Sequence, residues 1–518
     1  MDDTYDAVVV GSGFGGGITA CRLAEAGWRV CVLERGRRFG RGDFPDRPAQ
    51  APAMLWHRTL NPGGMFDVRL MRDLSVVTAA GVGGGSLVYA NVQLRAPAGA
   101  FEGSGWPAQI TRSALDPYYD RTEDALEPVP TPDGLRKLAA FDALAARAGM
   151  TAERLPLAVN FEAERLNPFS GVPQGRCENL ARCNIGCPLH AKNTVDITYV
   201  ARAEQVGAEV FPLHEVERLE RAAGGGWQVS YRDLETRARG VVSAPVVVLA
   251  AGTIGSTRLL LKNRRRIGSL SPALGTRFSG NGDALGGAFD PQRPELADAR
   301  MDVGPVMTSR FDLWDDGRMM VADGALPENF SGLLKIVRGM NAATGWRRVL
   351  LRVLDVVARL GGSDRAVPPR AVNLKPDRPI TDALVFLMIG QDAANGRMRL
   401  TPLLRTLDIR WDKRASQGLF DRMEATTDRL AQAADGERHF ALDGGPLGKF
   451  ITVHPLGGCP MSDSPARGVV DAYGAVHGAE GLYVFDGSIV PSALGVNPSK
   501  TIAALAERNV EKLLERRA

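Results

Sequence analysis

The feature that most constrains the fold is a strand–turn–helix–strand unit at the start of the chain. Residues 5–10, YDAVVV, have the continuous apolar character of a buried parallel strand. A helical pattern then runs through Ala26, and a second strand-like run, RVCVLE, ends at Glu34. The turn before the helix has the sequence Gly11-Ser12-Gly13-Phe14-Gly15-Gly16. This glycine fingerprint, in the context that it requires, predicts a Rossmann-like α/β domain that binds a dinucleotide.

Each glycine of this fingerprint has a physical role. Gly11 allows the tight turn after the strand, Gly13 lets the backbone approach a pyrophosphate, and Gly16 lets the helix pack closely. Free N–H groups at the helix start then bind the phosphates. The carboxylate of Glu34, at the end of the second strand, is placed to accept hydrogen bonds from ribose hydroxyls. The fingerprint alone does not distinguish FAD from NAD.

The chain of 518 residues is longer than one hydrophobic core usually serves, so we expect two domains that share one cofactor. The net charge is only +4 and the basic residues are scattered, which argues against a nucleic-acid partner.

The N-terminus has no basic, cleavable signal, and no window reaches the roughly 18 consecutive apolar residues of a membrane-spanning helix. Six cysteines in a chain of this length do not resemble a secreted disulfide framework. These features predict a cytoplasmic protein. A basic amphipathic segment at 330–361 allows a peripheral membrane contact, against the alternative of helices that cap the substrate cavity.

The segment that begins at His454, HPLGGCPMSDSPARGVVDAYGAVHGAEGLYVFDGSIVPSALGVNPSKTIAALAERNVEKL, resembles the glucose-methanol-choline (GMC) oxidoreductases. The similarity is greatest to the bacterial cholesterol oxidase branch. It extends to residues 5–36, to GVGGGSLVYANVQLRAP at 81–97 and to the strand–helix at 245–261. The resemblance implies a GMC-like fold, an elongated FAD and the oxidation of an alcohol by hydride transfer to flavin N5. It also implies a discontinuous FAD-binding domain at 1–95, 200–290 and 450–518, with an inserted α+β substrate-binding domain at 96–199 and 291–449.

The resemblance also implies which residues contact FAD. The ADP half would lie on the first glycine turn and the end of the second strand, the flavin and central part on the second glycine cluster, the adenine on the backbone of Val216, and the ribityl and pyrophosphate on the FDGS motif. The implied set is Gly11, Gly13, Phe14, Gly15, Gly16, Glu34, Arg35, Gly83, Gly84, Gly85, Ser86, Val216, Ala251, Gly252, Asp486, Gly487, Asn497 and Pro498.

His454 occupies the catalytic position of the family motif, where a histidine would take the hydroxyl proton as the hydride leaves carbon. Its partner by resemblance is Asn497, which could hydrogen-bond the substrate oxygen or the flavin edge. Asn497 followed by Pro498 also has the pattern of a helix N-cap with proline at the first helical position. Both roles can hold together, because a helix start aimed at the flavin would stabilise negative charge there.

Cys177, Cys183 and Cys187 fall in GRCENLARCNIGCPLHAKNT. This spacing resembles the cysteine run of cluster-bearing FAD glucose dehydrogenases, which suggests a 3Fe-4S cluster. The alternatives are packed thiols, which we favour, and a zinc site with His190 as the fourth ligand. Cys21 and Cys31 are expected in the core, and Cys459 is assigned no chemistry.

By resemblance, the expected substrate is a bulky apolar alcohol such as a sterol or terpenoid, with oxygen or another compound as electron acceptor. A steroid isomerase glutamate is not identified with certainty; Glu328 is the only suggestion. The alternatives are a sugar or polyol dehydrogenase that passes electrons through an iron–sulfur cluster, a light-driven fatty-acid decarboxylase of the same fold, and a non-catalytic electron carrier. His454 and Asn497 argue against the last two.

Overall fold

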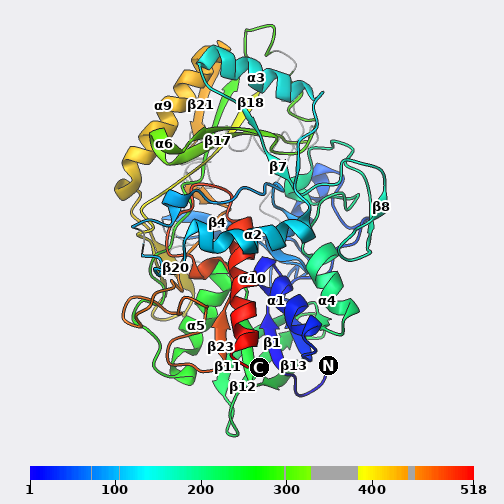
Figure 1. The fold of residues 1–518 in the computed structure, drawn as a ribbon, viewed down its shortest axis with the longest axis vertical. Helices are drawn as coiled ribbons and strands as arrows, with labels where there is room; N and C mark the ends of the chain where they lie inside the picture. Colours follow the sequence, from blue (N-terminus) through cyan, green and yellow to red (C-terminus); the bar gives the residue numbers. More distant parts are fainter. Residues whose placement is uncertain (72, 104, 297–298, 328–382, 442–449, 518) are drawn as a thin grey trace.

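The computed structural model describes residues 1–518 except 72, 104, 297–298, 328–382, 442–449 and 518 (Figure 1). The basic segment at 330–361 and the suggested Glu328 both lie outside the described residues. In the described part of the chain, no helix has the length and apolar content needed to cross a membrane.

A five-stranded parallel sheet is assembled from three distant parts of the chain. Its order is β10 (Glu209–Phe211), β2 (Val30–Leu33), β1 (Ala7–Val10), β14 (Val246–Leu249) and β23 (Leu482–Val484). All residues of the two central strands are at most 4% exposed. Strands covered on both faces need continuous apolar runs, which explains why AVVV and VVVL form this part of the sheet. The predicted Rossmann-like α/β fold is confirmed.

Helices pack around this sheet. They are α1 (Phe14–Glu25), α2 (Arg112–Leu126), α4 (Ala201–Gln205), α5 (Gly252–Ile267) and α10 (Ser499–Glu515). Figure 1 shows α10 and α1 side by side near β1, and Arg22 on α1 pairs with Glu507 on α10 at 2.9 Å. The predicted C-terminal helix is confirmed. Beyond its apolar face it also buries polar residues such as Thr501 and Asn509, so it is packed on more than one side.

The middle of the chain forms an antiparallel sheet of β11 (His214–Arg221), β12 (Trp227–Asp233) and β13 (Arg239–Ala244). A second three-stranded sheet joins β22 (Phe450–Thr452) to β4 (Leu74–Ala79) and β3 (Phe66–Leu70). Strand β22 ends two residues before His454, so this sheet supports the segment that carries the predicted base.

A six-stranded antiparallel sheet lies apart from the five-stranded parallel sheet in the strand pairing. Its order is β21 (Glu437–Ala441), β15 (Ala284–Phe289), β18 (Leu384–Gly390), β17 (Met319–Gly324), β16 (Ser309–Leu313) and β6 (Glu153–Arg154). The helices α3 (Arg136–Ala148), α6 (Trp314–Gly317) and α9 (Gln417–Ala434) lie near it in Figure 1. The strand β15 pairs with β18 and β21 and so belongs to this sheet, although residues 200–290 were expected in the FAD-binding domain.

Three two-stranded pairs complete the described strands. They are β19 (Arg397–Leu400) with β20 (Leu407–Arg410), β5 (Val129–Pro130) with β7 (Pro156–Leu157), and β8 (Arg165–Leu166) with β9 (Pro173–Gln174).

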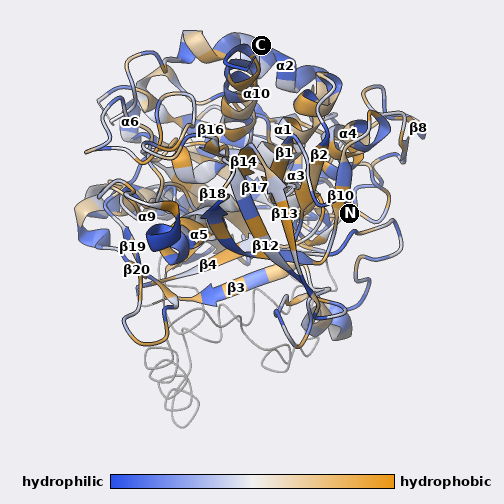
Figure 2. Cartoon of the chain, turned by 90° about the horizontal axis from the view of Figure 1, so that it is seen from below, coloured by the Kyte–Doolittle hydropathy of each residue, from blue (hydrophilic) through white to orange (hydrophobic). Residues whose placement is uncertain are grey.

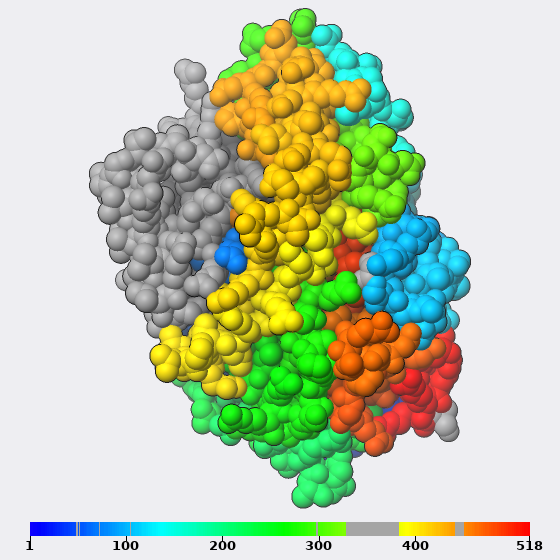
Figure 3. Space-filling model, turned by 90° about the vertical axis from the view of Figure 1, so that its left-hand side faces the viewer, coloured from blue at the N-terminus to red at the C-terminus, as the bar shows by residue number. Residues whose placement is uncertain are grey.

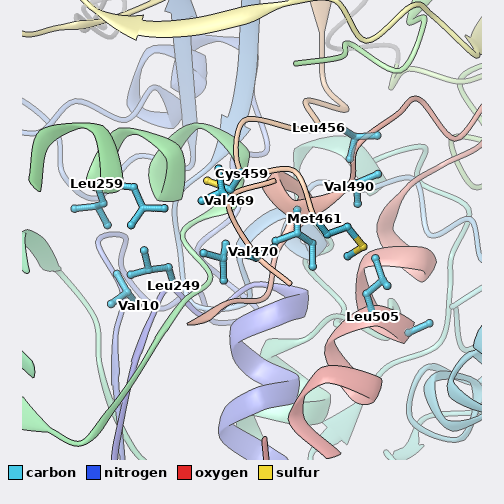
Figure 4. Close-up of a cluster of buried hydrophobic side chains, with 14 of the residues drawn as sticks. Val10, Leu249, Leu259, Leu456, Cys459, Met461, Val469, Val470, Val490 and Leu505 are labelled. Atoms are coloured by element: carbon cyan, nitrogen blue, oxygen red, sulfur yellow. The ribbon is translucent and has the colours of Figure 1, made fainter. Parts of the chain in front are cut away.

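The core joins the parallel sheet to the C-terminal segment. Figure 2 shows hydrophobic colours in the interior around β1 and β14. In the close-up of Figure 4, Val10 and Leu249 face α5, while Cys459, Met461 and Leu505 belong to the same buried cluster. Burial raises the pKa of the Cys459 thiol to about 12, in agreement with a packing role. On the face in Figure 3, the segment after His454 (orange) lies beside α5 (green) and the C-terminal residues (red).

Candidate active site and cofactor-binding residues

The first glycine turn brings three elements into close backbone contact. A Cβ on Gly16 would lie 1.9 Å from the carbonyl oxygen of Gly11, and one on Gly15 would lie 1.6 Å from that of Phe485. Close packing therefore requires glycine at both positions. Gly13 differs, because a Cβ there would meet only Gly84 Cα, at an ordinary 3.7 Å. The chain itself has room for a side chain at Gly13, which indicates that glycine serves a ligand at this position.

The second glycine cluster lies directly against the first. It enters the short helix η2 (Gly84–Leu87) through Gly83, which has φ +101°. A Cβ on Gly84 would lie 2.7 Å from Gly13 Cα. Ser86 donates to Gly83 O at 2.7 Å and accepts from Val195 N at 2.9 Å, which fixes the turn. Gly85 is exposed and has no neighbour at the Cβ position. The structure thus joins two glycine turns that are about 70 residues apart in the sequence.

Glu34 and Arg35 are engaged within the chain. The buried Glu34 carboxylate accepts from Ser12 Oγ at 2.8 Å and from Gly36 N at 2.8 Å. A carboxylate has about four acceptor positions, so a ribose hydroxyl can still be accommodated. Arg35 pairs with Asp67 at 2.7 Å and lies over the ring of Trp56. The guanidinium of Arg35 is therefore bound by the carboxylate of Asp67 in β3. A contact between Arg35 and the cofactor stays a prediction.

The predicted residues of the central and C-terminal segments meet at the start of α5. Asp486 caps the short helix η9 (Gly487–Ile489), where it accepts from Ser488 N at 2.9 Å, and it also accepts from Ser256 Oγ on α5. Burial raises the pKa of the Asp486 carboxyl. Ala251 and Gly252 form the start of α5. The predicted adenine contact, Val216, lies at a bulge of β11, which leaves an irregular backbone there.

His454 is held by a carboxylate that the sequence did not reveal. Its Nδ1 lies 2.7 Å from Asp283 Oδ1, and its side chain is 21% exposed. An ionised carboxylate can only accept, so Nδ1 carries a hydrogen, and in the neutral imidazole Nε2 then carries the lone pair. No hydrogen bond to Nε2 occurs among the described residues. The arrangement leaves a basic ring nitrogen available to a substrate.

Asn497 does not act as the predicted helix cap. The helix α10 begins at Ser499 with Pro498 in the N-cap position, and no side chain accepts a capping hydrogen bond. The helix starts one residue later than the sequence pattern indicated, so the Asn497 side chain lies outside the capping position. Asn497 is only 6% exposed, and its Oδ1 is buried without a partner. A buried, unpaired amide oxygen is costly, so this side chain is suited to a bound group.

Two further buried amides follow the second glycine turn and were not singled out from the sequence. Asn91 and Gln93 are 0% and 2% exposed, and none of their side-chain polar atoms has a partner. They lie on either side of Val92, which forms a bridge with Leu157, and Asn91 has a left-handed backbone with φ +67°. In the sequence, the only sign of these two residues was a pair of polar side chains two positions apart, shortly after GVGGGS.

The cysteine cluster does not form a metal site in the described structure. Cys177, Cys183 and Cys187 are free thiols, and no group of three or more potential ligands that could hold a metal occurs among the described residues. Burial raises the pKa of the Cys177 thiol to about 12 and also raises that of Cys187. The described residues therefore support neither the suggested iron–sulfur cluster nor the zinc alternative with His190.

Comparisons with known proteins agree with this arrangement. Two sequence models of GMC oxidoreductases match residues 6–264 and 400–506. A cholesterol oxidase of Mycobacterium tuberculosis (strain CDC 1551 / Oshkosh) is 32% identical over 550 residues, which cover 98% of this chain and 91% of that protein. A cholesterol oxidase of Acinetobacter baumannii is 28% identical and covers 97% and 93%. The crystal structure of pyridoxine 4-oxidase from Mesorbium loti, at 17% identity, has the same fold with a TM-score of 0.64 over 98% of this chain and 99% of that one.

Proposed function

Because the chain belongs to the GMC oxidoreductase family, whose members bind FAD, we propose that it oxidises a bulky apolar alcohol with His454 as the base. The observation that carries the proposal is the pairing of His454 Nδ1 with Asp283 at 2.7 Å, which leaves Nε2 as a proton acceptor. Asn497, whose buried amide oxygen has no partner, is the second element of the proposed site.

The residues present fit FAD. The two glycine turns expose backbone N–H groups that would hold the pyrophosphate, next to the start of α1. Glu34 would hold the ribose of the ADP half, and Asp486 the ribityl region. The buried, unpaired amides provide hydrogen-bonding groups for a planar polar ring system. When bound, FAD would supply the acceptor for the hydride.

His454 and Asn497 have different roles toward the alcohol. His454 Nε2 takes the hydroxyl proton while the C–H bond loses a hydride, and the C–O bond becomes a carbonyl. Asn497 donates from its side-chain NH₂ to the substrate oxygen and keeps that oxygen near the histidine. The 6% exposure of Asn497 means that this hydrogen bond would form in a dry environment, where it is strong.

The substrate class is proposed from the relatives. The two cholesterol oxidases named above act on a sterol with oxygen, so we propose a sterol or another large apolar alcohol, with oxygen as electron acceptor. We do not extend the proposal to an iron–sulfur cluster, because the three thiols form no metal-binding group, nor to steroid isomerisation. The proposal of a discontinuous FAD domain also stands, with its second segment ending before β15.

An anaerobic titration tests the proposed function. The visible spectrum of the purified holoenzyme is recorded while a 3β-hydroxysteroid, long-chain alcohols and sugars are added in turn. We expect the flavin band to bleach with the apolar alcohols. Bleaching by sugars alone, with a broad underlying cluster absorbance, would favour the polyol dehydrogenase. If no alcohol bleaches the band in the dark, the proposal is wrong, and light-dependent release of carbon dioxide from a fatty acid would establish the decarboxylase.

Replacing Asn497 with alanine should slow catalysis without weakening the fold. The side chain loses a hydrogen bond to the substrate oxygen, so we expect the rate constant of flavin reduction to fall by about 10²-fold. Oδ1 has no partner in the protein, so the melting temperature should change little. The measurements are stopped-flow flavin reduction and thermal unfolding.

The matched control is Asn263→Ala on α5. Asn263 is also buried, but its side chain donates to Leu259 O at 2.9 Å. This variant should lose stability and keep its reduction rate. If Asn497→Ala shows the same pattern as the control, the proposed contact of Asn497 with the substrate is wrong.

A further inference from the structure

One buried turn touches both segments that carry the proposed catalytic pair. Residues 279–283, SGNGD, lie between α5 and β15. Ser279 exchanges two backbone hydrogen bonds with Leu456, of 3.1 and 3.0 Å, and thereby binds the His454 segment. Asn281 and Asp283, at the middle and end of the turn, extend their side chains to different partners. Through hydrogen bonds, the turn therefore connects two parts of the site that are 43 residues apart in the sequence.

The Asp283 side chain fixes His454 and the residues before it. One carboxylate oxygen, Oδ1, accepts from the imidazole at 2.7 Å. The other, Oδ2, accepts from Thr452 Oγ1 at 2.9 Å, Val453 N at 2.9 Å and His454 N at 3.2 Å. A carboxylate held by four donors cannot rotate without breaking several hydrogen bonds. It therefore fixes both the direction of the ring and the tautomer with a free Nε2.

The Asn281 side chain fixes the loop that leads to Asn497. Its Oδ1 accepts from Leu494 N at 2.8 Å and Gly495 N at 3.2 Å, and its Nδ2 donates to Val496 O at 2.8 Å. Asn281 is completely buried. These three hydrogen bonds hold the three residues immediately before Asn497, so the position of the Asn497 backbone depends on Asn281.

The turn is itself held from the six-stranded sheet. The buried Asp392, just after β18, accepts from Gly280 N at 3.0 Å and from Gly282 N at 3.2 Å. Gly282 has φ +62°, and a Cβ there would lie 2.4 Å from Gly390 O. Only glycine permits this approach, which fixes the turn against the end of β18. The turn is thus rigid before any substrate binds.

We propose that the turn 279–283 is the positioning element of the catalytic pair: Asp283 sets the ring and tautomer of His454, and Asn281 sets the place of Asn497. The inference rests on the proposed function for the roles of His454 and Asn497. Neither Asp283 nor Asn281 touches the reacting atoms. Both act through another residue, and their effects should therefore depend on that residue being present.

Two double-mutant cycles test this dependence. Asp283→Asn is expected to lower the rate constant of flavin reduction by about 10- to 10²-fold in the parent and to have almost no effect in a His454→Gln background. Asn281→Ala should show the same loss in the parent and almost none with Asn497→Ala. The controls are the crossed pairs, Asp283→Asn with Asn497→Ala and Asn281→Ala with His454→Gln. In each crossed pair, the fold-losses in the rate constant of flavin reduction should multiply. Equal losses in all backgrounds would overturn the proposal.

Stability is separated from positioning by a matched carboxylate. Asp323 is also buried and accepts from Thr308 N at 2.6 Å and Ser309 N at 2.8 Å, within the six-stranded sheet. Asp323→Asn should lower the melting temperature, and its effect on the rate should be independent of His454. If Asn281→Ala does not fold, Asn281→Asp replaces it in the cycle, because it keeps both acceptor contacts of Oδ1.

A measurement without turnover distinguishes failure of this inference from failure of the proposed function. With isotope-labelled histidine, nitrogen NMR resolves the tautomers of the six histidines, and His454 is assigned from its loss in His454→Gln. We expect the Nδ1–H form in the parent and a mixture of both tautomers in Asp283→Asn. An unchanged tautomer would overturn the role of Asp283 even if alcohols reduce the flavin. A changed tautomer with no alcohol oxidation would leave the positioning intact and reject the proposed function.

Discussion

Replacing His454 with glutamine is expected to lower the rate constant of flavin reduction by an apolar alcohol by about 10²- to 10⁴-fold. Glutamine is close in size, and its amide NH₂ can donate to Asp283 as the Nδ1–H of histidine does. It has no basic nitrogen, so the hydroxyl proton has no acceptor as the hydride leaves. The loss corresponds to about 3 to 5 kcal/mol of transition-state stabilisation.

The measurement is stopped-flow reduction of the bound flavin, with the flavin content determined in the same sample. Flavin content and melting temperature should match those of the parent, because His454 is partly exposed and its backbone contacts are unchanged. The control is His439→Gln in β21, where the histidine pairs with Glu437 at 3.1 Å outside the proposed site. A reduction rate within about threefold of the parent in His454→Gln would contradict general-base catalysis by this residue.

A single methyl group at Gly13 is expected to expel the cofactor from a protein that still folds. The backbone of Gly13 has φ −70° and ψ −164°, which alanine adopts without strain. The new Cβ would have an ordinary 3.7 Å contact with Gly84. It would also occupy the space through which a pyrophosphate approaches the start of α1. We expect the affinity for FAD to fall by at least about tenfold, or about 1.4 kcal/mol.

Flavin absorbance per protein, titration of the apoprotein with FAD and far-ultraviolet circular dichroism test this expectation. Gly42→Ala is the control, because Gly42 is exposed and has no atom within 4 Å of the Cβ position. Gly16→Ala should behave differently from both and fail to fold, since its Cβ would overlap Gly11 O at 1.9 Å. Full retention of FAD in Gly13→Ala would show that the pyrophosphate does not pass this residue.

The sequence predicted those parts of the fold that depend on local patterns. The run YDAVVV, the glycine turn and RVCVLE specify β1, α1 and β2 because a parallel strand buried on both faces must be continuously apolar, and a helix close to it needs glycine. The helix after Pro498 was indicated by the pattern Asn497-Pro498, which is typical of a helix start. The membership of β15 in the six-stranded sheet could not be predicted, since its partners lie about 100 and 150 residues further along the chain.

The proposed catalytic pair, His454 and Asn497, could be identified from motifs. The residues that hold this pair in place could not. Nothing local in SGNGD indicates that Asp283 meets His454, 171 residues away, or that Asn281 holds the backbone next to Asn497, 213 to 215 residues away. The pattern before Pro498 favoured a helix cap at Asn497, and only the observed helix start showed that its Oδ1 has no partner. The close cysteine spacing suggested a cluster, but the described residues contain no group of three or more side chains that could hold a metal.

The sequence by itself therefore determined the parallel α/β sheet and the glycine turns, because periodicity and glycine requirements act over a few residues. The candidate base, His454, was named from the family resemblance of its segment. Only the tertiary structure decided which carboxylate holds His454, which amides remain unpaired and which glycine leaves room for a ligand. These properties depend on distances between segments that are far apart in the chain. Such distances are set by how the sheets and helices pack together, and no local sequence pattern determines them.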